Sequence, residues 1–252
     1  MIDGTQSSAT HQGQPWGPLA TAGATLLIGV AYLALQYGVL ALILWITGPD
    51  AGRIAAIHGI QALRDYGDVL TLGLLVSAIG AGSLLLWLTR ARRGITLGQY
   101  LAWRRVSFGT IAFWLGLLLL YIVAWELLAH YLGHDQTAAF MRTAYRTTHL
   151  LPLLWLAVIV VAPTFEELWF RGFLFAGIAR TRLGVAGAIL LTAGLWAALH
   201  MQYDLYDMTS VFLLGLLFGA ARHRTGSLWP SLSMHMFANL VATVETAAKL
   251  MR

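Results

Sequence analysis

The chain has 252 residues, of which 58% are hydrophobic and only 11% are charged. Soluble domains contain about a quarter charged residues, so this composition excludes an ordinary soluble domain. The chain has no cysteine, which excludes disulfides, iron–sulfur clusters, thiolate zinc sites and a cysteine protease. The net charge of +5 comes from arginines between apolar segments, a topology signal, and no nucleic-acid partner is expected.

The first 18 residues are polar and contain no Lys or Arg. They lack the basic region of a signal peptide, and we interpret residues 1–18 as a disordered N-terminal tail. Long apolar segments follow, and about 20 apolar residues are enough to cross a bilayer. The fold class is therefore all-α, a polytopic transmembrane helical bundle of about seven spans. The predicted spans are 19–47, 69–89, 108–130, 150–180, 185–202, 205–222 and 228–250.

Arginines gather in three of the predicted connections: Arg90, Arg92, Arg93, Arg104 and Arg105, then Arg180 and Arg182, then Arg222 and Arg224. With seven spans all three connections fall on one side, which the positive-inside rule makes cytoplasmic. Arg142 and Arg146 fall on the far side and count against this orientation. We expect an integral protein of a bacterial inner membrane, with the N-terminus in the cytoplasm.

The segment APTFEELWFRGFLF places two glutamates and an arginine inside an apolar run. Ionisable residues within a span are costly, so each is a candidate functional residue. Glu167 and Arg171 are four residues apart and can pair on one helix face. Glu166 points about 100° away, toward Phe170 and Phe173. Both glutamates are predicted catalytic residues with Arg171 in support, and Glu166 is the one free for acid–base work.

Counting residues from the connections predicts which polar side chains share one depth. Glu167 lies 16 residues before the turn at Leu183, and His200 lies 17 after it. At about 1.5 Å per residue, equal counts in a helical hairpin mean equal depth. The same count from the next turn puts Asn239 near the glutamates and His235 about one turn nearer the cytoplasm. We therefore expect His200 beside the glutamates.

These residue types suit hydrolysis of an amide bond. A carboxylate and an imidazole can hold and deprotonate a water. Glu166, His200 and His235 are also a common hydrolytic zinc set, with the fourth position left for water. Asn239 and a second histidine can donate hydrogen bonds to a developing oxyanion. The cofactor is thus either none or one divalent metal such as zinc, and the substrate a peptide or membrane protein in lipid. The oligomeric state stays open.

Three motifs then resemble the CPBP family of intramembrane proteases, which includes CAAX prenyl endoproteases and bacteriocin-processing or immunity proteins. FEELWFR is similar to the EExxxR motif of that family. WAALH resembles its second motif, an aromatic residue four positions before histidine, although Trp196 stands where phenylalanine is usual. TGSLWPSLSMHMFANL resembles its third motif, HxxxN after a turn with Gly and Trp. The resemblance covers residues 150–245.

The resemblance implies that residues 150–252 form a catalytic core of four helices, while the N-terminal helices in 19–149 have no motif. It implies that Glu166 activates the attacking water with His200, and that His235 and Asn239 stabilise the oxyanion. Members have been described both as metalloproteases and as metal-independent glutamate proteases, and the sequence permits either.

Two other interpretations stay open beside an intramembrane endopeptidase. One is a non-catalytic immunity or scaffolding membrane protein with the same core. The other is a proton-coupled transporter, since buried Glu and His also form proton relays. A transporter is expected to have an internal repeat and broken helices in both halves. The sequence shows no repeat, and Pro163 is the one obvious break within a span.

Overall fold

The computed structural model describes residues 13–47, 66–134 and 139–250. Within these ranges the chain forms helices and no strand, so the all-α prediction is confirmed. The helices of the N-terminal half are α1 (Pro18–Thr47), α3 (Gly67–Ala91), α4 (Leu97–Tyr100), α5 (Phe108–Leu132) and α6 (Ala139–Thr147). Residues 1–12 of the predicted tail lie outside the described residues.

The C-terminal half consists of one long interrupted helix followed by three regular ones. The long helix runs without a gap through α7 (Leu151–Leu156), a π segment (Ala157–Val161), α8 (Ala162–Glu167), a second π segment (Leu168–Leu174) and α9 (Phe175–Ile178). It is called the Leu151–Ile178 helix below. After it come α10 (Gly184–Ala198), α11 (Leu205–Thr225) and α12 (Trp229–Leu250).

All seven predicted apolar segments are helical, but they differ in their fitness to cross a bilayer. Among the described residues, five helices are long and apolar enough: α1, α3, α5, the Leu151–Ile178 helix and α11. The fifth predicted span is shorter than expected, since α10 has only 15 residues and ends at Ala198. A helix of that length does not reach across a bilayer core of about 30 Å. The place of α10 therefore rests on packing against its neighbours. Helix α12, with 22 residues, is long enough to cross but is not among the five candidate spans.

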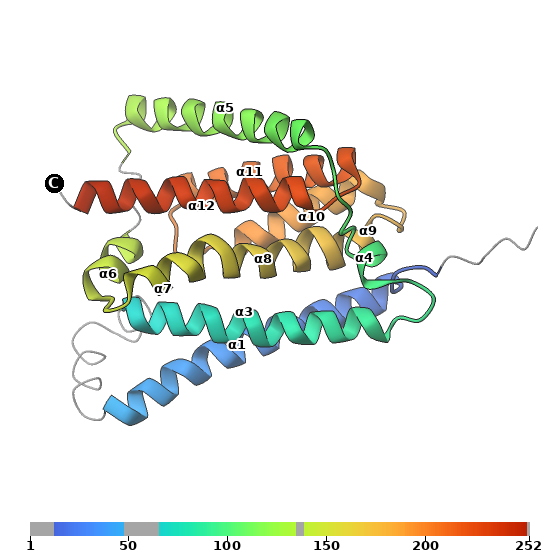
Figure 1. Ribbon diagram of the computed structural model, residues 1–252, viewed down its shortest axis with the longest axis horizontal. Coiled ribbons are helices and arrows are strands. Elements are labelled where there is room, and N and C mark those ends of the chain that lie inside the picture. The colour runs from blue at the N-terminus through green and yellow to red at the C-terminus, as the bar shows by residue number, and fades with distance from the viewer. Residues whose placement is uncertain (1–12, 48–65, 135–138, 251–252) are drawn as a thin grey trace, which may run out of the picture.

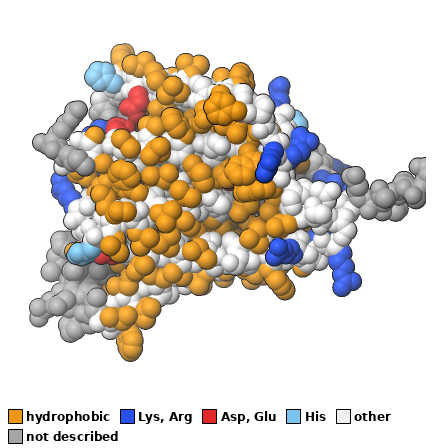
Figure 2. All heavy atoms as spheres, viewed as in Figure 1, with side chains coloured by type: hydrophobic (Ala, Val, Ile, Leu, Met, Phe, Trp, Pro, Cys, Tyr) orange, Lys and Arg blue, Asp and Glu red, His pale blue; other side chains and the backbone are white. Residues whose placement is uncertain are grey.

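The long helices lie side by side along the longest axis of the molecule, with α1 crossing α3 obliquely (Figure 1). Their connections alternate between the two ends. The α3–α5, α9–α10 and α11–α12 connections all lie at one end (Figure 1). The three arginine clusters lie in these connections or in the last helical turn before them. Figure 2 shows most of the visible Lys and Arg side chains at that end and a broad hydrophobic band across the middle. This end is called the arginine end below.

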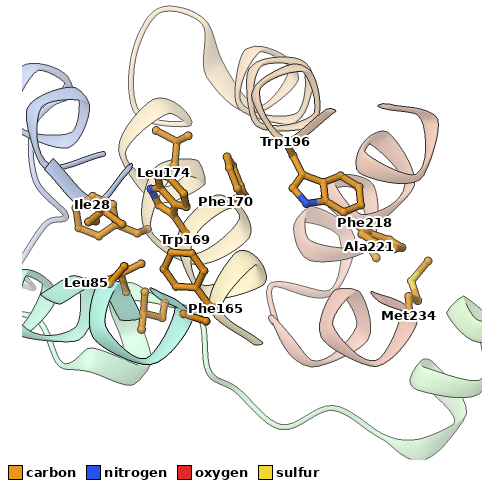
Figure 3. Close-up of a cluster of buried hydrophobic side chains, with 14 of the residues drawn as sticks. Ile28, Leu85, Phe165, Trp169, Phe170, Leu174, Trp196, Phe218, Ala221 and Met234 are labelled. Atoms are coloured by element: carbon orange, nitrogen blue, oxygen red, sulfur yellow. The ribbon is translucent and has the colours of Figure 1, made fainter. Parts of the chain in front are cut away.

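Aromatic side chains hold the Leu151–Ile178 helix in the middle of the bundle. Phe165 and Trp169 of this helix are buried between it and α1 and α3, next to Leu85 (Figure 3). The ring of Phe165 stacks on Tyr32 of α1 with centroids 5.2 Å apart. On the other side lie Trp196 of α10 and Phe218 of α11 (Figure 3). The helix with the two glutamates is thus packed on both sides, and its side chains are positioned by rigid neighbours.

Candidate active site

The predicted pair of Glu167 and Arg171 is present and wholly buried. Arg171 Nη1 donates to Glu167 Oε1 over 3.0 Å, and both side chains have 0% exposure. Arg171 Nη2 also donates to the carbonyl of Gly215 on α11 over 3.3 Å. The guanidinium lies 4.6 Å from the ring centroid of Trp196, a cation–π distance. Charge pairing, a carbonyl and an aromatic face together compensate for placing this arginine in the core.

His235 connects the two glutamates. Its Nδ1 lies 3.1 Å from Glu167 Oε1 and its Nε2 lies 3.8 Å from Glu166 Oε2. Since an ionised carboxylate only accepts, Nδ1 is the donor to Glu167, and Nε2 faces Glu166. The imidazole is 3% exposed. The expectation that His200 would lie beside the glutamates, with His235 a turn away, is therefore wrong: His235 is the histidine between them.

Two departures from regular helix explain this error in depth. The second π segment lies between Glu167 and the turn at the arginine end. A π turn contains more residues than an α turn, so counting at the α-helical rise places Glu167 too far from that end. Helix α10 also stops early. His200 donates its backbone N–H to Ala197 over 2.9 Å, an i to i−3 bond, and lies in the turn before α11 instead of within the predicted span.

Glu166 has a polar partner that the sequence analysis did not identify. Trp196 Nε1 donates to Glu166 Oε2 over 2.5 Å. Glu166 was expected among Phe170 and Phe173 without a partner, and the structure corrects this. The available signal was the tryptophan at a position where phenylalanine is usual, because only tryptophan offers an N–H. The side chain of Glu166 is 20% exposed, whereas the side chains of Glu167 and His235 are 0% and 4% exposed.

His200 is oriented by the backbone of α10. Its Nδ1 lies 2.8 Å from the Trp196 carbonyl, which can only accept, so Nε2 is left with its lone pair. Its ring stacks on Tyr203 with centroids 5.8 Å apart. Burial, together with the carboxylates of Asp207 and Glu166, raises the pKa of Tyr203 to about 12. Its hydroxyl therefore stays protonated at neutral pH. No described hydrogen bond or ion pair joins His200 to either glutamate.

Asn239 of α12 lies against the first π segment. Its Nδ2 donates to the carbonyl of Val158 over 2.7 Å, and one amide hydrogen remains for another acceptor. The second π segment is held in a similar way, because Arg222 Nε donates to the carbonyl of Arg171 over 3.0 Å. π segments are often found at functional sites. Here each one offers a carbonyl to a side chain from a neighbouring helix.

Three of the predicted site residues line one cavity of about 460 Å³. Glu166, His200 and Asn239 all line it, and so does Trp196. Glu167 and His235 do not line it and are buried behind Glu166. A wall of the cavity comes from α1, which has no motif, through Gly29, Tyr32, Leu33, Gln36 and Tyr37. The volume is in the range of small-molecule and peptide side-chain sites.

The predicted metal set was tested against this geometry. Among the described residues, one group of His, Asp and Glu has ligand atoms all within 4.8 Å of one another: His134, Asp204 and Asp207. Glu166, His200 and His235 are not such a group, and His235 Nδ1 is engaged with Glu167. In this arrangement the three side chains do not fit a zinc shell, so the steps below are derived from the residues alone.

Comparisons with known proteins agree with the motifs. Residues 148–241 match the family model described as type II CAAX prenyl endopeptidase Rce1-like, so the resemblance is confirmed over this segment. The chain is also similar to the uncharacterized protein YyaK of Bacillus subtilis (strain 168), with 28% identity over 155 residues. The match covers 59% of this chain and 50% of the relative, so the chain spans about half the length of the curated relative. No solved structure matches the chain.

Proposed function

We propose that this chain, whose residues 148–241 match the Rce1-like family, is an intramembrane endopeptidase that hydrolyses a peptide bond with a water activated by Glu166 and His200. The observation that supports this most is the position of Glu166. It lines the cavity with one oxygen fixed by Trp196, while Glu167, His235 and Arg171 form a buried set of hydrogen-bonded side chains behind it.

The proposed chemistry begins with proton transfer from water. Glu166 takes a proton from a water in the cavity as the water oxygen bonds to the carbonyl carbon of the substrate. His200 Nε2, which keeps its lone pair, accepts the second hydrogen bond of that water and orients it. The tetrahedral intermediate has an oxyanion, to which the remaining Nδ2 hydrogen of Asn239 donates. The proton on Glu166 then passes to the leaving nitrogen, the C–N bond breaks, and an amine and a carboxylic acid are released.

His235 has a different role here from the one that the resemblance implies. Because it is 3% exposed and lies behind Glu166, we assign it to positioning instead of oxyanion binding. Its Nδ1 donates to Glu167, whose charge Arg171 balances, and its Nε2 faces Glu166. These three side chains thus fix the position of the Glu166 carboxylate, the proposed base, and the electrostatic field around it.

The five apolar helices and the arginine end support a location and an orientation in the membrane. We propose a bacterial inner membrane, with the arginine end and the N-terminus in the cytoplasm. The substrate would be a peptide or a segment of a membrane protein in lipid. The proposed hydrolysis uses no metal, because Glu166, His200 and His235 are not gathered as a ligand set.

The test is a comparison of the membrane proteomes of cells that express the wild type or Glu166→Gln. The substitution keeps the shape of the side chain and removes the base, so new peptide termini found with the wild type should be absent with the variant. Equal thermal stability of the two purified proteins is the control for folding. Cleavage that persists in Glu166→Gln would contradict the proposal. A biological effect that persists without cleavage would favour a non-catalytic immunity or scaffolding protein.

A further inference from the structure

From Glu166 the cavity reaches about one turn toward the arginine end, to Trp169 and Phe170, and much further toward the opposite end. Its more distant lining residues come from elements that meet at the end opposite the arginines: Tyr37 of α1, Leu70 of α3, Met141 of α6, Gln202 of the α10–α11 turn and Thr246 of α12. None of the described residues that line it belongs to the three arginine-bearing connections. The reactive carboxylate therefore stands at the inner end of a space that runs away from the arginine end.

Toward the arginine end the site is closed by packed side chains. Arg171 and Phe173 are fully buried, and Tyr100 is 1% exposed. The rings of Tyr100 and Phe173 stack with centroids 5.4 Å apart. A methyl group added at Gly172 would lie 3.0 Å from a methyl of Leu101, so these two residues are in tight contact. A second cavity of about 280 Å³ at this end is lined by Leu101 and Leu168, but Glu166 does not line it. A peptide could not reach Glu166 from this end without unpacking the core.

Toward the opposite end the lining residues meet the surface. Met201, in the α10–α11 turn, is 80% exposed, and Tyr37 of α1 is 51% exposed. Both also line the cavity. The opening is thus bordered by the outer half of α1 on one side and by the turn that holds His200 on the other.

The lining also restricts the chemistry of a ligand. Apart from Glu166 and His200, the described lining residues are apolar or uncharged, and none of them is Lys or Arg. Such a wall has no cation for a free terminal carboxylate or an acidic side chain. Gln36 adds an amide on α1 that makes no described hydrogen bond, within a helix that has no charged residue. An amide there can donate to and accept from the backbone of a bound peptide.

We infer that the substrate is an uncharged, mainly apolar internal peptide segment that reaches Glu166 from the end opposite the arginines. Under the positive-inside rule this is the side away from the cytoplasm. The inference rests on the proposed endopeptidase function and adds to it the direction and the chemical class of the substrate. Segments of exported or membrane proteins on the outer face meet both conditions.

The direction can be measured without any cleavage, because the chain has no native cysteine. Ala162 lines the cavity one turn before Glu166 and is 7% exposed. Ala162→Cys is labelled with a membrane-impermeant, charged thiosulfonate, in spheroplasts from outside and in inverted vesicles from inside. Met201→Cys and Leu183→Cys mark the two ends, since both positions are strongly exposed. Ala188→Cys, at a fully buried position outside the cavity, is the unlabelled control.

Ala162→Cys should be labelled from the same side as Met201→Cys, and that side should be the outside. Labelling together with Leu183→Cys, or no labelling from either side, would overturn the direction of the cavity. If Met201→Cys and Leu183→Cys exchange sides, the outer source of the substrate is wrong. None of these results depends on proteolysis, so they are separate from the outcome for Glu166→Gln.

The chemical class is tested on the same Ala162→Cys protein in detergent. A synthetic decapeptide of Leu, Ala and Gly with blocked ends should slow the labelling severalfold. The matched peptide with one central Asp should leave the rate unchanged. The first peptide should also leave the labelling of Leu183→Cys unchanged, because Leu183 is exposed and does not line the cavity. Equal protection by both decapeptides would overturn the assignment of an uncharged segment.

Discussion

Trp196 contacts four residues of the candidate site. Its indole N–H donates to Glu166, its carbonyl accepts from His200, and its ring lies 4.6 Å from the guanidinium of Arg171. The same ring meets His235 edge-on with centroids 5.0 Å apart. A phenylalanine at this position could repeat the ring contacts but not the hydrogen bond. This chain therefore fixes the carboxylate of Glu166, the proposed base, with a donor that phenylalanine lacks.

Replacing Trp196 by Phe should lower kcat and leave the fold intact. A hydrogen bond to a charged group contributes about 1.5–3 kcal/mol, which corresponds to a rate loss of roughly tenfold to a hundredfold. The measurements are kcat and KM on a cleaved peptide together with the melting temperature. Trp229→Phe is the matched control, because its buried indole N–H has no partner in the described structure. Equal rates for Trp196→Phe and the wild type would remove this bond from the mechanism.

Removing one charge of the Glu167–Arg171 pair should destabilise the protein more than removing both charges together. Glu167→Gln leaves a buried guanidinium without its carboxylate, and breaking a buried pair costs about 3–5 kcal/mol. The double variant Glu167→Gln, Arg171→Met should recover part of this loss, because both charges leave the core. Thermal unfolding of the purified proteins measures the effect.

The control for this pair is Glu245→Gln, which removes the carboxylate of the exposed pair with Lys249. Solvent screens such a pair, so its loss should cost no more than about 1 kcal/mol. If Glu167→Gln is as stable as the wild type and wholly inactive, Glu167 and not Glu166 is the proton acceptor.

The two π segments are the elements that shape the site. The first offers the Val158 carbonyl to Asn239, and the second offers the Arg171 carbonyl to Arg222. They divide a 28-residue helix into three short α-helical pieces without ending it. This accounts for the length of the predicted fourth span, residues 150–180. The extra residues move Glu167 into register with His235 instead of His200.

Asn239→Ala should reduce kcat by a factor on the order of 10²–10³, the usual effect of losing one oxyanion donor. It also leaves the Val158 carbonyl without this partner, so a stability loss of about 1–3 kcal/mol should accompany it. Thr164→Val is the control, since Thr164 Oγ1 donates to Val160 in the same π segment and does not line the cavity. Rates close to the wild type in both variants would leave Asn239 with a structural role alone.

At the scale of the whole molecule, the two ends have different properties. One end gathers the arginines over a packed aromatic core, and the other end contains the opening of the cavity. The N-terminal helix α1 belongs to this division, because its outer half forms a cavity wall while Trp16, just before it, donates to Leu88 near the arginine end. Helices without a motif thus take part in the site.

Prolonged treatment of the purified protein with EDTA or 1,10-phenanthroline should leave cleavage unchanged. The reason is that Glu166, His200 and His235 are not gathered as a ligand set. A His134→Gln variant, treated in parallel, identifies any effect that acts through the His134, Asp204 and Asp207 group. Loss of activity in both proteins, restored by zinc or cobalt, would show that the predicted metal set assembles after all.

The features that could be predicted from the amino-acid sequence are those that depend on local composition and on the spacing of residues within a helix. The apolar segments, the sharing of one end by the three arginine clusters and the pairing of Glu167 with Arg171 all follow from local composition and a spacing of four residues. The family resemblance over residues 148–241 also lies in linear motifs. These features do not depend on how one helix is rotated or shifted against another.

Contacts between side chains of different helices could not be predicted in this way, because they depend on the tertiary structure. His235 lies where His200 was expected, Trp196 Nε1 donates to Glu166, and α1 forms a wall of the cavity. Each of these contacts depends on axial shifts of a few ångströms, which the π segments and the early end of α10 introduce. An unbroken rise of 1.5 Å per residue cannot represent such shifts, because they arise where packing between helices overrides the regular hydrogen-bond pattern within one.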